Sequence, residues 1–175
     1  MIRQYRDLAQ GEFIVLGGDC AQGGIDSNWV QCLSKDRLDV PIVLQMPGVA
    51  ASMTPVLHKL AEWIFDQTGV QPVVALERNM GGASEMERLR KINLLNKYRL
   101  YTMQDYDTDK GESQTHKLGY ITNTVTRPRM LGDLKEAIDS RLLKIYDKET
   151  IEQLQMFIVN KSGKSVVVLY SFGDT

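Results

Sequence analysis

The sequence predicts an α/β domain in which helices flank a mixed central sheet. Two observations predict this class. Short apolar runs bounded by glycine, which are typical of buried strands, alternate with longer stretches in which apolar residues recur at helical spacing. The expected order begins with three strands, a helix, a strand and a helix and ends with two helices and a strand, which differs from the regular alternation of a Rossmann fold or a barrel.

Length and composition fit one soluble, intracellular domain. The chain has 175 residues, of which 43% are hydrophobic and 25% are charged, so it can bury a substantial core. Its 21 Lys and Arg residues and 22 Asp and Glu residues give a formal charge of −1. This balance excludes a protein coated in basic residues, so any contact with phosphates must come from a local patch. No apolar run approaches the roughly 20 residues that span a bilayer.

The first part of the chain predicts a meander of three strands. Residues 13–18 form a largely apolar run closed by glycines, which is the pattern of a buried strand. A polar, glycine-rich turn separates this run from two further strands, at residues 29–33 and 40–46. Pro41 cannot donate a backbone hydrogen bond, so we expect it at a sheet edge or a bulge.

A clear amphipathic helix follows and leads to a fourth strand. Thr54 can cap this helix, Pro55 suits its first turn and Gly69 ends it. The next strand, residues 71–77, is reached through a helix, so we expect it to run parallel to its neighbour in the sheet.

The second half of the chain contains weaker signals. Residues 105–117 are polar and charged, which is typical of a loop or a hairpin tip. The remaining elements are expected as helices at residues 84–96 and 128–141, a helix opened by Asp147, and strands at residues 99–103, 118–122 and 166–170.

Two carboxylates stand at the ends of apolar strands. Asp19 follows the first strand and Glu77 ends the fourth, where an ionised side chain is costly unless it meets water, a cation or a metal. If these strands are parallel neighbours, both carboxylates lie at the same edge of the sheet, and side-chain alternation puts them on one face. Such a pair of hard oxygen ligands suits Mg²⁺ or Mn²⁺. The alternative is that each is a solvated carboxylate at a strand end.

Positive charge is concentrated downstream of Glu77. Residues 78–99 contain six Lys or Arg against two Glu, and Lys117, Arg127 and Arg129 add to this excess. Such a cluster either forms a solvated face or neutralises backbone phosphates without reading bases.

Three motifs together resemble those of a known family. The first, residues 15–24, is a strand running into an aspartate and a turn of small residues; the second, residues 76–82, is a glutamate followed by asparagine and glycine. The third, residues 118–123, is a glycine-aromatic-x-Thr-Asn segment. In this order the chain resembles, over nearly its whole length, the nuclease domain of the large terminase subunit of tailed bacteriophages. That resemblance implies an RNase H-like mixed central sheet flanked by helices.

The resemblance also implies a divalent-metal-dependent endodeoxyribonuclease. Two Mg²⁺ or Mn²⁺ ions would be held by Asp19, Glu77 and a third acidic residue, for hydrolysis of a phosphodiester bond by a two-metal mechanism. Asp26 and Asn79 would support the metal ligands or orient the substrate. Together with the charge distribution, the resemblance predicts DNA contacts at Arg78, Lys117, Arg127 and Arg129.

Two parts of the family pattern are missing from this sequence. The third acidic motif, typically His-Asp-Asp after the last strand, is absent. Asp174, which lies one or two residues early, is the candidate third catalytic and metal-binding carboxylate. The packaging ATPase that precedes the nuclease in the family is also absent. We therefore expect residues 1–12 to be the linker from that ATPase and residues 13–175 to be the nuclease domain, truncated at its C-terminal end.

The implied function is the cutting of concatemeric duplex DNA during viral genome packaging. Its implied partners are double-stranded DNA, the viral portal or procapsid and the small terminase subunit, in the cytoplasm of the bacterial host and transiently on the procapsid. Two alternatives stay open. The chain could be another RNase H-like nuclease, such as a resolvase or a ribonuclease H, or a non-catalytic RNase H-like module that binds DNA or the procapsid.

Overall fold

The computed structural model describes residues 1–21, 26–105, 115–155, 157–159 and 165–167. Their central feature is a seven-stranded sheet with helices on both sides, which confirms the predicted mixed α/β class. Its strands are β1 (Ile2–Gln4), β2 (Ile14–Asp19), β3 (Ser27–Ser34), β4 (Asp39–Pro47), β5 (Val73–Leu76), β6 (Arg99–Leu100) and β9 (Lys144–Ile145).

The remaining elements are helices and two short hairpins. The helices are α1 (Ala50–Thr68), the single turn η1 (Asn79–Gly81), α2 (Gly82–Ile92), α3 (Thr126–Asp139) and α4 (Lys148–Gln155). The hairpins pair β7 (Thr102–Asp105) with β8 (Thr115–Leu118), and β10 (Phe157–Val159) with β11 (Ser165–Val167).

The sheet combines an antiparallel meander with a parallel extension. Its order is β1–β4–β3–β2–β5–β6, with β9 also paired to β4. The pairs β2–β5, β5–β6 and β4–β9 are parallel, and the other pairs are antiparallel. The predicted meander and the predicted parallel arrival of β5 through a helix are therefore confirmed.

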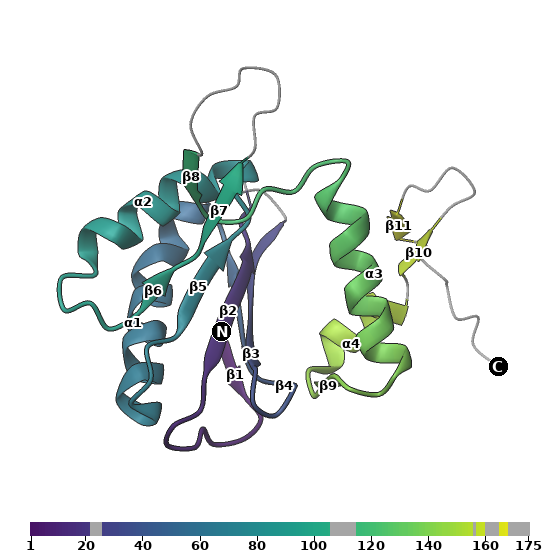
Figure 1. Cartoon of the computed structure of the whole chain (residues 1–175), viewed down its shortest axis with the longest axis horizontal. Coiled ribbons are helices and arrows are strands. Elements are labelled where there is room, and N and C mark those ends of the chain that lie inside the picture. Colours follow the sequence, from purple (N-terminus) through teal and green to yellow (C-terminus); the bar gives the residue numbers. More distant parts are fainter. Residues whose placement is uncertain (22–25, 106–114, 156, 160–164, 168–175) are drawn as a thin grey trace.

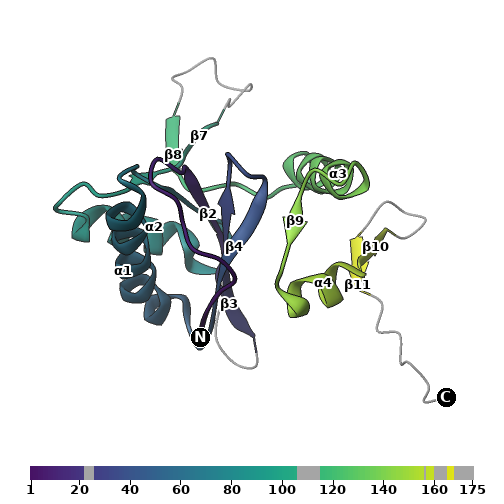
Figure 2. The same ribbon diagram turned by 90° about the horizontal axis from the view of Figure 1, so that it is seen from below.

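The hydrophobic core lies between α1, α2 and one face of the sheet. Ile14 and Leu16 of β2, and Val74 and Leu76 of β5, are fully buried there against both helices. Helices α3 and α4 lie on the opposite side of the sheet, near β4 and β9 (Figures 1 and 2). Because side chains alternate along a strand, every second residue of β2 and β5 faces away from the main core.

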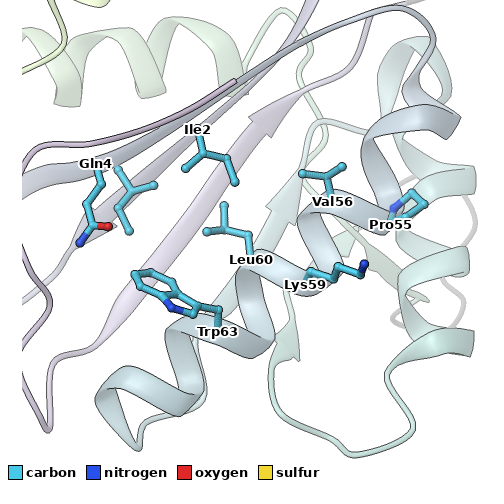
Figure 3. A pocket seen from close by; sticks show the side chains of 8 residues that line it. Ile2, Gln4, Pro55, Val56, Lys59, Leu60 and Trp63 are labelled. Atoms are coloured by element: carbon cyan, nitrogen blue, oxygen red, sulfur yellow. The ribbon is translucent and has the colours of Figure 1, made fainter.

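A pocket of about 400 Å³ opens on the core side of the sheet, between β1 and α1. Figure 3 shows Ile2 and Gln4 of β1 opposite Val56, Leu60 and Trp63 of α1. Apolar side chains dominate this pocket, and it lies on the sheet face opposite to that of Asp19 and Glu77. It therefore takes no part in the site described below.

Helix α1 begins earlier than predicted. Its first residue is Ala50, preceded by Val49, which makes no side-chain cap. Thr54 is buried one turn into the helix, and its hydroxyl donates to the Glu85 carboxylate of α2 instead of capping. Pro55 lies exposed in the second turn. The predicted end is confirmed, because Gly69 has a φ of +71° and its N–H bonds to a carbonyl one turn back.

Three other boundaries differ from the prediction. Residues 1–12, expected as linker, contribute β1, which pairs with β4. Helix α2 ends at Ile92, four residues before the predicted end, and the Ile92 side chain is exposed. The strand predicted at residues 118–122 lies earlier in the chain, because β8 ends at Leu118.

Several weaker expectations are confirmed. Pro41 lies where the pairing of β3 with β4 shifts register, as expected for a bulge. The carboxylate of Asp147 accepts the backbone N–H of Thr150 at 2.8 Å at the start of α4. Strand β11 covers the beginning of the strand predicted at residues 166–170, whose last three residues lie outside the described part. Within that described part, no helix is long and apolar enough to cross a membrane.

Candidate active site

The parallel pairing of β2 with β5 brings Asp19 and Glu77 together. Gly18 pairs with Leu76, and the backbone N–H of Glu77 donates to the carbonyl of Gly18 at 2.8 Å. The next residues along the two strands are Asp19 and Glu77, so their backbones are about 4.8 Å apart. Both lie on one face of the sheet, as the alternation of side chains predicted, and this face points away from the main core.

A tight turn after β5 directs the chain away from Glu77 into α2. Met80 and Gly81 have φ values of +53° and +95°, which turn the chain sharply after Asn79. At Gly82, a Cβ atom would lie 1.8 Å from the backbone carbonyl oxygen of Glu77. Only glycine lets α2 start this close to the end of β5. The sequence Asn-Met-Gly-Gly thus sets the position of Glu77 by local sterics.

The segment after β8 completes the support of Glu77. The backbone of Tyr120 donates to the Leu76 carbonyl at 2.8 Å and accepts from the Arg78 N–H at 2.8 Å, forming a bridge with Glu77. Gly119 allows this approach, because its φ is +87° and a Cβ there would lie 2.7 Å from the Leu76 carbonyl oxygen. Residues 76–78 are thereby held on both sides.

Asn79 fixes the Glu77 side chain directly. Its Nδ2 donates to Glu77 Oε1 at 2.8 Å and lies 3.4 Å from the Thr122 carbonyl oxygen. This hydrogen bond holds the Glu77 carboxylate in one orientation.

The surroundings of Asp19 raise its pKa. The main cause is its partial removal from water, and the next is repulsion by the Glu77 carboxylate. Asp26 also acts to raise this pKa, whereas the Cys20 backbone N–H and the Arg127 guanidinium act to lower it. Two carboxylates that repel each other at a strand end favour a bound cation, which relieves the repulsion. Carboxylate oxygens are also the donors that Mg²⁺ and Mn²⁺ prefer, so the donor set fits such an ion.

The predicted basic residues lie in different surroundings. Arg127 is in the first turn of α3, close enough to act on Asp19, and Arg129 is exposed on the same helix. Lys117 lies half-buried on β8. The Arg78 guanidinium donates to the carbonyl of Leu118, so its hydrogen bond goes to the protein backbone.

The third predicted carboxylate, Asp174, lies outside the described residues. Within residues 1–21, 26–105 and 115–155, no group of three or more His, Cys, Asp or Glu side chains is arranged to hold a metal ion. The described part of the chain thus supplies the pair Asp19 and Glu77, with Asp26 near enough to influence Asp19.

Similarity to solved structures identifies the fold. Over 98% of this chain and 79% of the other, it superposes on the large terminase nuclease from thermophilic phage G20c with bound magnesium, with a TM-score of 0.63 and 14% identity. The chain has the fold of a large terminase nuclease domain. The corresponding domain of Thermus phage P74-26 gives a TM-score of 0.63 at 15% identity over 99% of this chain and 78% of that one.

A more distant terminase nuclease shares the fold as well. The human cytomegalovirus domain, Mn-soaked and inhibitor-bound, gives a TM-score of 0.54 at 11% identity over 81% of this chain and 74% of that chain. No protein-family model matches the sequence, and no curated protein matches it significantly. The RNase H-like terminase nuclease fold predicted from three motifs is therefore confirmed by structure.

Two aromatic residues that were not predicted as site residues flank the carboxylates of this terminase nuclease fold. Trp29 of β3 pairs with Asp19, and Tyr120 bridges to Glu77. The resulting row across the sheet is Trp29, Asp19, Glu77 and Tyr120. Alternation along β3 could have indicated Trp29. Tyr120 is the aromatic residue of the motif at residues 118–123, but its place beside Glu77 depends on a contact between segments 43 residues apart.

Proposed function

We propose that the chain is the metal-dependent DNA endonuclease domain of a viral packaging terminase, which cuts concatemeric duplex DNA by two-metal phosphodiester hydrolysis. The observation that carries this proposal is the adjacency of Asp19 and Glu77 at the ends of two parallel strands. The terminase nuclease fold supports it, and the named neighbours with bound magnesium or soaked manganese support a divalent cation.

The proposed role of the protein is to hold the metal ions and to orient the groups that bind them. Asp19 and Glu77 would bind the ions, and Asn79 would keep the Glu77 carboxylate in one orientation through its 2.8 Å hydrogen bond. Divalent ions bound there would activate a water and stabilise charge on the leaving 3′ oxygen. Asp174 is our proposed third ligand, and Asp26 would orient substrate or support Asp19.

The DNA backbone would approach from the side of α3. Arg127 already acts on the charge of Asp19, so it is the basic residue best placed to contact a phosphate near the cut. Arg129, Lys117 and Arg78 would extend this contact, and the Arg78 guanidinium also donates to the carbonyl of Leu118 at the end of β8. Contacts of this kind are to the backbone, so we propose that cutting tolerates many sequences.

The wider setting is part of the same proposal. The portal or procapsid and the small terminase subunit would be partners of the full protein, which would act in the bacterial cytoplasm and transiently on the procapsid. The terminase nuclease fold supports the packaging role, and these partners and locations belong to that proposed role.

Cleavage of supercoiled plasmid in Mg²⁺ or Mn²⁺ tests the nuclease. We expect nicking by the chain, and a loss of at least about 100-fold in Asp19→Asn and Glu77→Gln, since each removes a charge that holds the ions. Asp66→Asn is the matched control, because Asp66 is an exposed carboxylate on α1 that pairs with Lys97. Cleavage that persists in both site variants would refute the proposal.

The presence of only two clustered carboxylates in the described part favours one alternative, a non-catalytic module that binds DNA or the procapsid. Plasmid cleavage by a chain extended past Thr175, alongside the present chain, separates the two. The absence of cleavage by either chain would favour the binding module. A panel of duplex DNA, branched DNA and RNA–DNA hybrid then distinguishes a terminase nuclease from a resolvase or a ribonuclease H.

A further inference from the structure

Two tyrosines lie beside the carboxylate pair on the face of the sheet that points away from the main core. Tyr120 bridges to Glu77, and the N–H of Tyr101 donates to the Val74 carbonyl at 2.9 Å, which places Tyr101 opposite Ala75. The two rings contact each other, with centroids 6.4 Å apart and planes inclined by 37°. We call Tyr101 and Tyr120 the aromatic platform.

Independent contacts confirm which face the platform occupies. Arg99, two residues before Tyr101, places its guanidinium 5.7 Å from the centre of the Phe13 ring. Phe13 lies six residues before Asp19, so alternation puts both on one face. Tyr101, Tyr120 and the two carboxylates therefore share the face opposite the main core.

Only small side chains lie on the surface beside the carboxylates and the platform. Gly17 is exposed, and a Cβ atom there would meet nothing within 4 Å. Its partner on β5 is Ala75, the side chain next to Tyr101 in the sheet. Gly17 and Ala75 thus form a floor of small residues, bounded on one side by Tyr101, a residue that is 37% exposed.

We propose that the aromatic platform stacks against an unpaired nucleobase of the DNA strand held at Asp19 and Glu77. This inference rests on the proposed nuclease function and deepens it by assigning a base-binding subsite. Every base has an aromatic face, so stacking on tyrosine needs no particular sequence. Tyr101 and Glu77 are offset by one strand and two residues, about 6.6 Å along β5. A single nucleotide can span that offset, with its phosphate at the carboxylates and its base on the platform.

Pairing in the substrate decides whether the platform can be used. In an intact duplex the faces of the bases are covered by their neighbours, so only a single-stranded or locally opened segment offers a base. The platform therefore predicts tighter binding to single-stranded DNA, or to duplex with an opened step, than to closed duplex of the same sequence.

Fluorescence of 2-aminopurine in a short single-stranded DNA tests the subsite. The titration is run in Ca²⁺, so that binding is measured without relying on cleavage. We expect quenching on binding by the wild-type chain and by Tyr101→Phe, which keeps the ring. In Tyr101→Leu we expect the quenching to be lost and affinity to fall roughly 5- to 100-fold, while affinity for closed duplex stays unchanged.

Phe13→Leu is the matched control, since it removes a ring from the same sheet face away from the carboxylates. Unchanged quenching in Tyr101→Leu, or an equal loss of affinity for single strand and duplex, would overturn the proposal. If Tyr101→Leu fails to fold, photocrosslinking of 5-iodouracil DNA to the wild-type chain replaces it. Adducts on Tyr101 or Tyr120 would support the platform, and adducts only elsewhere would refute it.

The plasmid assay keeps this result separate from the nuclease proposal. Quenching that depends on Tyr101 in a chain that never cuts plasmid would uphold the base-binding subsite and remove the catalytic function. Cleavage that depends on Asp19, with no quenching by any variant, would uphold the catalytic function and remove the base-binding subsite.

Discussion

Gly82 sets the position of Glu77 because it has no side chain. A Cβ at Gly82 would lie 1.8 Å from the Glu77 carbonyl oxygen, and that atom belongs to the backbone and cannot rotate away. We expect Gly82→Ala to lower the free energy of unfolding by about 1–3 kcal/mol. It should also reduce plasmid cleavage by about 100-fold, because a shift of 1 Å in a catalytic group is costly.

Urea unfolding and plasmid cleavage, measured together, check the Gly82→Ala prediction. Gly132→Ala is the control, since Gly132 lies in helix α3 and a Cβ there meets nothing within 4 Å. That control should gain about 0.5–1 kcal/mol of stability, because alanine favours a helix. Wild-type cleavage in Gly82→Ala would show that α2 can move without disturbing Glu77.

Asn79 is predicted to matter for metal affinity more than for folding. Its exposed amide donates to Glu77 Oε1 at 2.8 Å, so Asn79→Ala frees the carboxylate to rotate. We expect Mn²⁺ binding, followed by isothermal titration calorimetry, to weaken about 10- to 100-fold. Thermal unfolding without metal should change little. A Mn²⁺ affinity equal to that of the wild type would mean that Asn79 does not support a metal ligand.

At the scale of elements, what the sequence predicted depended on local patterns. The apolar runs before Asp19 and Glu77 revealed β2 and β5, and the helix between them implied parallel pairing, so adjacency of the carboxylates followed. Contacts between distant segments carry no such signal. Thr54 looks like a helix cap, yet its hydroxyl is used by Glu85 of α2, 31 residues away. The bridge from Tyr120 to Glu77 could not be predicted from the sequence for the same reason.

The contact between α1 and α2 gives a prediction at this scale. Glu85 is 4% exposed, and the Thr54 hydroxyl is its buried donor, while Arg88 lies 3.5 Å away at the surface. Thr54→Val keeps the shape of the side chain and removes the donor. We therefore expect the free energy of unfolding in urea to fall by about 1–3 kcal/mol. With Glu85→Met added, the two effects should be clearly non-additive. Additive losses would show that the hydrogen bond contributes nothing.

For the whole molecule, a buried ion cluster joins the N-terminal segment to the sheet. The Arg6 guanidinium lies 2.5 Å from carboxylate oxygens of both Glu12 and Asp39, which are almost fully buried. Burial alone would raise the pKa of Glu12, but hydrogen bonds from Arg6, Ala9 and Ser34 outweigh it and lower the pKa to about 2. Hydrogen bonding from Arg6 likewise lowers the pKa of Asp39. Residues 1–12 are thus part of the folded domain.

This cluster predicts how the stability of the whole domain depends on pH. A carboxyl group whose pKa is lower in the folded state stabilises the fold at pH values above its unfolded pKa, 4.5 for Glu12. That contribution, up to about 3 kcal/mol for Glu12, is lost as the pH falls from about 5 toward 2. We expect the free energy of unfolding in urea to fall steeply over this range. Glu12→Gln should be less stable than wild type at pH 7, and the difference should shrink toward pH 3. A difference that stays constant with pH would show that Glu12 does not couple proton binding to folding.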